Sequence, residues 1–304
     1  MKTNKSLIIN FSVILLSLFF LFGCQSSSNQ TVKNDPTLNN TVENTENISE
    51  SIRSIFYNIP SPLEMANIIH QHNLIYDPLV LSGFGREKQL LTQEYQALNL
   101  GVYGADFSCC NVFEQMQDAI KYLSSIRALT QILQIPPEES NQIVERLENN
   151  IEYRDSLILF VTSLFLNADS YLKENQRQGT AVLILLGSWV EGMYIATHLK
   201  LANNREDFKE RIAEQKFSFF NIYRLFETHK KNNQLTKDIF AKLIDIKAIY
   251  DQVIIRSNNV EIEIFSEYKK AVLRADGTIE IPETMLPQLK ENLSELRTLI
   301  LNKN

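Results

Sequence analysis

Two carboxylates stand out among the side chains whose type and position could support chemistry. Glu191 lies in an almost wholly apolar segment, and Asp106 directly follows a stretch that contains Gly101 and Gly104. A buried charge is costly without a partner, so a carboxylate on an apolar helix must be paired, protonated or facing a cavity. Either residue could therefore serve a hydrolytic site or a structural hydrogen bond, and the sequence leaves both interpretations open.

A metal centre is not predicted. The chain has four histidines. His70 and His72 are two residues apart near a helix end, where they point to different sides. Glu191 and His198 share a helix face but lie two turns apart, about 10 Å along the axis, which one ion cannot bridge. Since the sequence also lacks a His-Glu-x-x-His motif and any paired cysteine spacing, we expect no metal ligands.

Other catalytic motifs are also missing. Cys109 and Cys110 are adjacent, and a bond between neighbouring cysteines does not fit inside a helix, so we interpret them as small packing residues. A nucleophilic thiolate would need a base beside it, which the sequence cannot place. The pair Gly83 and Gly85 lacks the third glycine and the preceding strand of a dinucleotide site. No cofactor is predicted.

The N-terminus has the pattern of a targeting sequence. Lys2 and Lys5 precede an apolar run from Leu7 to Phe22, followed by Gly23 and Cys24. This is the pattern of a secretory signal, and a cysteine after a small residue resembles the lipobox of bacterial lipoproteins. That resemblance implies cleavage after residue 23 and lipidation of Cys24. The alternative is an uncleaved anchor, but the run is about 16 residues, fewer than the roughly 20 of a spanning helix.

Residues 24–49 are predicted to be a flexible polar tether, because asparagine, threonine and serine dominate them and no apolar period occurs. By resemblance to lipoprotein sorting rules, the presence of Gln25 instead of aspartate directly after Cys24 disfavours the inner membrane. The acidic cluster that directs surface export in Bacteroides-type bacteria is absent as well. We therefore expect an outer-membrane lipoprotein that faces the periplasm.

The remaining residues, 50–304, are predicted to form a single domain. The formal charge of the chain is −6, which argues against a general nucleic-acid binder. The segment 200–256 is an exception with a net charge of +4, but both signs alternate along it. A solvated helix face and a contact with anionic lipid are both compatible with that pattern.

Most of this domain has helical periodicity. Residues 61–64, Ser-Pro-Leu-Glu, combine an N-cap, a first-turn proline and a capping-box glutamate. The glycines at positions 101 and 104 predict a break between a helix over residues 87–99 and one that begins near Asp106 and stops at Pro136. The other amphipathic helices are predicted over residues 137–147, 205–229, 235–255 and 287–301.

Two segments, 151–175 and 179–201, are apolar on every side of a helix. Such segments must be buried on all faces, so they predict a central helical hairpin in the core. Neither is expected to cross a membrane, because the longest uninterrupted apolar run is about ten residues. Small residues recur at every fourth position from Ser188 to Ala196, which favours close packing of a neighbouring helix or leaves a slot.

The periodicity changes near the C-terminus. Residues 260–264 alternate strictly between apolar and charged side chains, as in a strand. Residues 272–275 and 278–281 predict a hairpin with Asp276-Gly277 as its two-residue turn. The same segment matches the second half of a calcium loop that ends at Glu283. Calcium is rejected because the first and third loop positions would supply no oxygen ligand.

Three stretches, residues 58–64, 98–106 and 187–194, resemble a group of uncharacterised lipoproteins of Bacteroides-type bacteria when they are read with the lipobox and the closing hairpin and helix. The resemblance covers the chain from about Ile55 to its end. It implies a mainly α-helical bundle on a lipid anchor, and it brings no known activity and no functional residue.

A candidate pocket is predicted where these stretches converge. Three of its residues surround the expected break between helices and three lie on the central hairpin; they are Asn99, Tyr103, Asp106, Trp189, Glu191 and Tyr194. The alternative is a set of buried structural hydrogen bonds. The leading hypothesis is a non-enzymatic envelope lipoprotein that binds a protein partner or a small molecule. The second is a periplasmic enzyme, such as a hydrolase, that uses Glu191 or Asp106.

Overall fold

The computed structural model describes Ile68, Gln71, residues 74–136, Phe165 and residues 168–201, 206–265 and 270–301. Within these residues the protein is mainly α-helical, with two small antiparallel sheets of two strands each. The predicted signal sequence, the tether and Cys24 lie outside the described residues, as do the helix predicted over 137–147 and most of the one that begins at residue 61. Those predictions therefore stay predictions.

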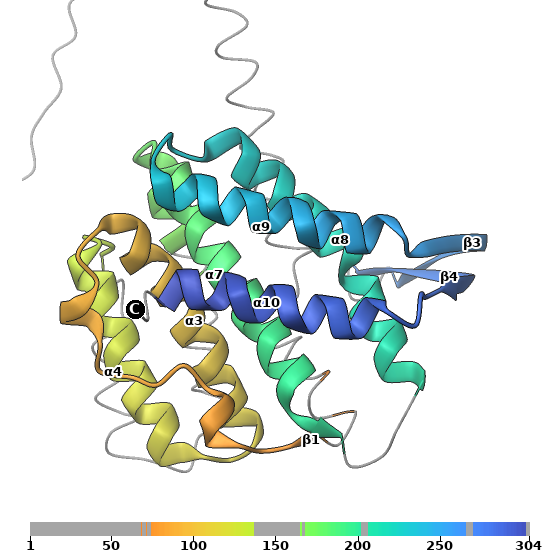
Figure 1. The fold of residues 1–304 in the computed structure, drawn as a ribbon, viewed down its shortest axis with the longest axis horizontal. Helices are drawn as coiled ribbons and strands as arrows, with labels where there is room; N and C mark the ends of the chain where they lie inside the picture. The colour runs from red at the N-terminus through yellow and green to blue at the C-terminus, as the bar shows by residue number, and fades with distance from the viewer. Residues whose placement is uncertain are drawn as a thin grey trace, which may run out of the picture. The chain divides into compact units, whose positions relative to one another are not determined.

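The larger elements follow one another as helices, a β-hairpin and a final helix (Figure 1). The main helices of the described chain are α3 (Gln93–Val112), α4 (Met116–Ile132), α7 (Gln178–His198), α8 (Glu206–His229), α9 (Gln234–Asp251) and α10 (Met285–Leu301). The strands are β1 (Leu74–Ile75), β2 (Lys200–Leu201), β3 (Ile254–Phe265) and β4 (Lys270–Glu280). Strand β1 pairs with β2, and β3 pairs with β4.

Helix α7 is the core of the body, as its apolar sequence predicts. It packs against α3, α8 and α10. Its length and hydropathy would suit a membrane span, but 78% of its most apolar window is buried inside the body. The first arm of the predicted hairpin is described only at Phe165 and from residue 168 onward. Among the described elements, α3 makes the most extensive contact with α7.

The predicted break at Gly101 and Gly104 is wrong, because α3 runs without interruption through both glycines. The two helices cross with their backbones in contact. A Cβ atom on Gly101 would lie 1.9 Å from the carbonyl oxygen of Ile184, and one on Gly187 would lie 2.0 Å from that of Leu98. The glycines therefore permit close packing of α3 on α7, and they do not form a hinge.

Helix α3 ends at Val112, about two turns after Gly104, and the residue types at this end give little sequence signal. Glu114 has a φ of 58°, in the left-handed region that glycine usually occupies at the end of a helix. The amide of Gln115 reaches back to the carbonyl of Cys110 at 2.8 Å, which completes a Schellman-type turn. Helix α4 then begins at Met116 and stops before Pro136.

The C-terminal elements follow the predictions with two corrections. The helix predicted over residues 235–255 ends at Asp251, and Ile254 and Ile255 are the first residues of β3. The capping box of Asn233 and Thr236 starts α9, and α8 and α10 begin within two residues of their predicted starts. The hairpin predicted between residues 272–275 and 278–281, with Asp276-Gly277 as its turn, is wrong, because the single strand β4 runs through residues 270–280 and pairs with β3. Asp276 and Gly277 lie inside β4, opposite Ser257 and Asn259, where the register of the β3–β4 ladder shifts. An Asp-Gly pair suits such an irregularity as well as it suits a turn.

Candidate functional site

The six candidate residues do not line one open pocket. Asn99, Tyr103 and Asp106 lie on one face of α3, since they are separated by four and then three residues. All three are fully buried. Glu191 is also fully buried on α7. Asn99, Asp106 and Glu191 converge on the C-terminal half of α10, and the structure there is a packed polar cluster in the core.

The strongest contact of this polar cluster is an ion pair between α7 and α10. Arg297 donates from Nε to Oε2 of Glu191 and from Nη2 to Oε1, both at 2.6 Å. The guanidinium also donates to the carbonyl oxygen of Val80 at 2.9 Å. Burial opposes the charge of Arg297, but the carboxylate of Glu191 outweighs this and raises the pKa of Arg297. Both oxygens of Glu191 therefore take part in a charge-assisted contact that links α7 to α10.

Asp106 lies on α3 beside this ion pair. The backbone amide of Ser82 donates to its Oδ2 atom at 3.2 Å, and the hydroxyl of Ser82 donates to the same oxygen. Oδ1 is buried and has no hydrogen-bond partner. Burial raises the pKa of Asp106 well above its ordinary value and the nearby Glu191 raises it further, while Ser82 and Arg297 act in the opposite direction.

Side chains also donate hydrogen bonds to the last carbonyl groups of α10. The amide of Asn99 donates to the carbonyl oxygen of Ile300 at 2.9 Å, and the guanidinium of Arg86 donates to that of Leu301 at 2.5 Å. The last carbonyl groups of a helix have no partner within the helix, so these bonds cap α10. Asn99 is thus a structural residue that ties α3 to the last turn of the chain.

Tyr194 is half-buried at the edge of the polar cluster. The guanidinium carbon of Arg297 lies 3.9 Å from the centre of its ring, and the ring of His198 stacks on it at 3.8 Å. Nε2 of His198 lies 3.0 Å from the hydroxyl oxygen of Ser294. Burial lowers the pKa of His198, and the positive charges of Lys290 and Arg297 lower it further. The bond from His198 to the carbonyl oxygen of Tyr194 acts in the opposite direction but does not outweigh burial, so the neutral imidazole is favoured.

Trp189 and Tyr103 carry buried polar atoms without a partner. The indole of Trp189 packs against Phe219 of α8 with ring centres 5.3 Å apart, so Trp189 contacts a different helix from Glu191. Its Nε1 atom has no hydrogen-bond partner, and neither does the hydroxyl of Tyr103. Burial raises the pKa of Tyr103 to about 12, which keeps its hydroxyl neutral. Such atoms are typical neighbours of buried water.

The two adjacent cysteines are buried free thiols. Burial raises the pKa of Cys110 to about 12 and that of Cys109 well above its ordinary value. The thiolate is the reactive form of cysteine. Neither residue is therefore placed to act as a nucleophile, and Cys110 instead lies 3.9 Å from the hydroxyl of Tyr76.

Among the described residues, no group of histidine, cysteine, aspartate or glutamate side chains is arranged to hold a metal ion. His198 bonds to Ser294 and to its own helix, as described above. His229 lies at the C-terminal end of α8. His70 and His72 lie outside the described residues.

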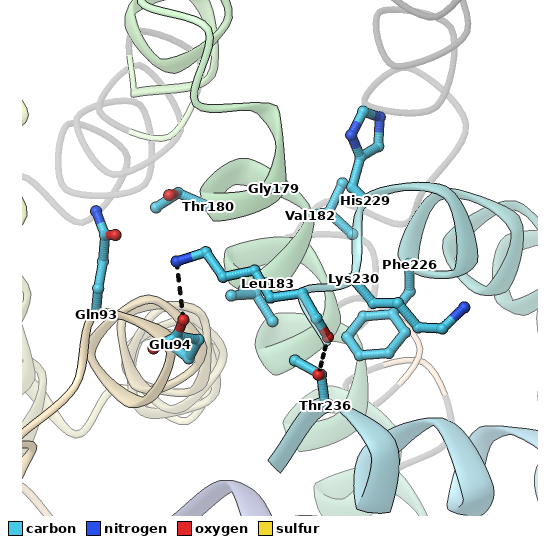
Figure 2. A pocket seen from close by; sticks show the side chains of 11 residues that line it. Gln93, Glu94, Gly179, Thr180, Val182, Leu183, Phe226, His229, Lys230 and Thr236 are labelled. Carbon is cyan, nitrogen blue, oxygen red and sulfur yellow. Dashed lines mark hydrogen bonds and ion pairs between the residues drawn. The ribbon is translucent and has the colours of Figure 1, made fainter. Parts of the chain in front are cut away.

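A small pocket of about 30 Å³ does exist, but none of the six candidates lines it (Figure 2). The first turns of α3, α7 and α9 and the last turn of α8 form its wall. Lys231 closes one side by an ion pair of 2.9 Å with Glu94, and its carbonyl oxygen accepts a hydrogen bond from Thr236. Figure 2 shows His229 and Lys230 pointing away from Glu94. The α7 residues that line the pocket lie about 12–18 Å from Glu191 along the helix axis.

Two residues of the polar cluster, Arg297 and Ser82, are absent from the sequence-based candidates. Arg297 had a detectable signal. It is four residues after Leu293 and four before Leu301, so it lies on the buried stripe of α10. A cation on one apolar stripe and a carboxylate on another apolar helix form a natural pair. Ser82 lies in a loop and had no comparable signal.

No protein-family model, curated protein or solved structure matches the chain.

Proposed function

We propose that the protein is a lipid-anchored component of a bacterial cell envelope, whose helical body binds a protein partner or a small molecule without catalysing a reaction. The proposed anchor is Cys24, and the proposed location is the outer membrane on its periplasmic side. The lipobox-like sequence and its resemblance to uncharacterised lipoproteins of Bacteroides-type bacteria support the anchor and the location. Two or three acyl chains would hold such a body stably on a bilayer.

The observation that carries the non-enzymatic part is the burial of both candidate carboxylates. A catalytic carboxylate must come within hydrogen-bond distance of a substrate atom. Glu191 is fully buried and both of its oxygens bond to Arg297. Asp106 is equally buried and bonds to Ser82. The hydrolase alternative would need the core to open at this point, so the binding role is the better supported of the two.

The anchor is tested by labelling cells with a palmitate analogue. The wild-type chain should carry the label and sediment with membranes, whereas Cys24→Ser should lose the label. Cys109→Ser is the matched control, because this second cysteine is buried in α3 and should leave labelling intact. Persistent labelling of Cys24→Ser would refute the anchor.

The binding role is tested by crosslinking in intact membranes, followed by purification of the anchored chain. The wild-type chain and Asp106→Asn should capture the same partner in the same amount, because Asp106 is fully buried and does not lie on a surface that a partner could contact. A hydrolytic activity that Asp106→Asn abolishes, at an unchanged melting temperature, would contradict the proposal and support the enzyme.

A further inference from the structure

The polar cluster contains two carboxyl groups and one guanidinium. Glu191 and Arg297 form a complete ion pair with two short hydrogen bonds. Burial raises the pKa of Asp106, and the neighbouring carboxylate of Glu191 raises it further. Oδ2 of Asp106 accepts two hydrogen bonds from Ser82, whereas its Oδ1 has no donor in a fully buried position.

Two carboxylates that share a buried site cannot both ionise without a large cost. The positive charge of Arg297 is already balanced by Glu191, to which it is bound through two atoms. A proton on Oδ1 of Asp106 would remove the second negative charge. It would also turn Oδ1 into a hydrogen-bond donor. Glu191 can accept this hydrogen bond, because an ionised carboxylate has about four lone-pair sites and Arg297 occupies two.

We propose that Asp106 and Glu191 bind one proton between them at neutral pH, which Asp106 carries on Oδ1 and donates to Glu191. The cluster is then electrically neutral, with a protonated Asp106, an ionised Glu191 and a charged Arg297. The shared proton joins α3 to α7, and the ion pair joins α7 to α10. The contact between α3 and α7 at the centre of the fold therefore depends on this proton.

The groups that face Asp106 from the packed elements leave this balance unchanged. On its own helix, Cys109 is a buried thiol whose pKa is raised by burial. From α4, Tyr122 is a buried phenol whose pKa is also raised, by burial first and by Asp106 next. From α10, Arg297 supplies a positive charge, which the ionised Glu191 balances. Cys110 and Tyr103 of α3 also interact with Asp106, and burial raises the pKa of both, so they stay neutral as well.

The proposal makes the stability of the protein fall as the pH rises. In the unfolded chain Asp106 loses its proton near the ordinary pKa of about 3.9, but in the folded chain it keeps the proton to a higher pH. The folded state therefore binds one proton more than the unfolded state between these two values. This contribution to stability is fully present below about pH 3.9 and is lost as the pH rises through the folded pKa. Over that window the unfolding equilibrium constant grows about tenfold per pH unit from this residue alone.

The experiment compares Asp106→Asn with the wild-type full chain in non-ionic detergent. Unfolding by denaturant is measured at several pH values from 4 to 9, and infrared spectra are recorded at neutral pH. The control is Asp118→Asn, because Asp118 is a partly exposed residue of α4 that pairs with Lys121. We expect the unfolding equilibrium constant of Asp106→Asn to lose the tenfold change per pH unit that one proton causes. We also expect its infrared spectrum to lose the absorption of a protonated carboxyl group. Asp118→Asn should keep both.

Equal pH dependence in Asp106→Asn and wild type would overturn the proposal. So would the absence of a protonated-carboxyl band from the wild-type spectrum at neutral pH, which is the result expected if an ordered water satisfies Oδ1. Should Asp106→Asn fail to fold, the wild-type chain with ¹³C-labelled aspartate decides the matter. One aspartate carboxyl carbon must then show the protonated chemical shift at pH 7, and its absence would overturn the proposal.

Discussion

Two of the ion pairs that join separate elements of this protein differ in almost every respect that determines strength. Arg297 and Glu191 meet at 2.6 Å with side-chain exposures of 9% and 0%. Lys231 and Glu94 meet at 2.9 Å, with the lysine 62% exposed and the glutamate 12%. The first pair is bidentate and lies inside the core, and the second closes one side of the small pocket at the surface.

The comparison shows that burial decides whether an ion pair holds the fold. Removing one partner of a buried pair leaves an uncompensated charge in the core, whereas an exposed pair is screened by solvent and costs side-chain entropy to form. The polar cluster is therefore a structural joint.

The largest expected effect comes from Arg297→Met. It removes the guanidinium and leaves an unbranched apolar side chain, so the negative charge of Glu191 stays buried without a positive partner. We expect a loss of about 3–5 kcal/mol in the free energy of unfolding, measured by denaturant titration. Lys242→Met, which breaks the partly exposed contact with Glu295 on α10, should cost about 1 kcal/mol or less. Similar losses in both variants would mean that burial does not distinguish the two kinds of pair.

A smaller effect is expected at the crossing of α3 and α7. Gly101→Ala would place a methyl group against the carbonyl of Ile184, so the helices must separate, at a cost of about 1–3 kcal/mol. Gly187→Ala meets the same crossing from the other helix and should cost a similar amount. If these glycines were hinges, alanine would instead stabilise the helices through its better helix propensity. The sign of the change in melting temperature therefore distinguishes packing from hinging.

The smallest effect is expected from Lys231→Ala at the pocket. Burial opposes ionisation of Glu94, but the bond to Lys231 prevails and the pKa of Glu94 is lowered. The unfolding free energy should change by about 0–1 kcal/mol at low salt, and less in high salt because the pair is screened. A loss as large as that of Arg297→Met would show that the pocket wall is as integral to the fold as the polar cluster.

Much of this fold could be predicted from local pattern. The all-round apolar sequence of α7 predicts its burial, and the change of period after Ile255 predicts the strands. The failures have specific causes. Gly101 was interpreted as a break because glycine has low helix propensity, but the contact of two backbones overrides propensity. Asp276-Gly277 was interpreted as a turn because that dipeptide favours turns, although pairing with β3 places it inside a strand.

The candidate site shows the same limit. Glu191 and Asp106 were identified because a carboxylate in an apolar segment demands an explanation. Their partners could not be assigned, because Arg297 is 106 residues from Glu191 in the sequence and only tertiary packing brings the two together. The pocket at the helix ends carried no sequence signal, since it is formed by the first and last turns of four separate helices.

The most direct test of the structural role of the polar cluster is a double-mutant cycle between Glu191 and Arg297. The free energy of unfolding is measured for Glu191→Met, Arg297→Met, the double variant and the wild type. The account predicts that each single variant loses about 3–5 kcal/mol and that the double variant recovers about 3 kcal/mol of the summed losses, because no charge is then left buried alone. Losses that simply add, with no coupling between the two positions, would contradict the account.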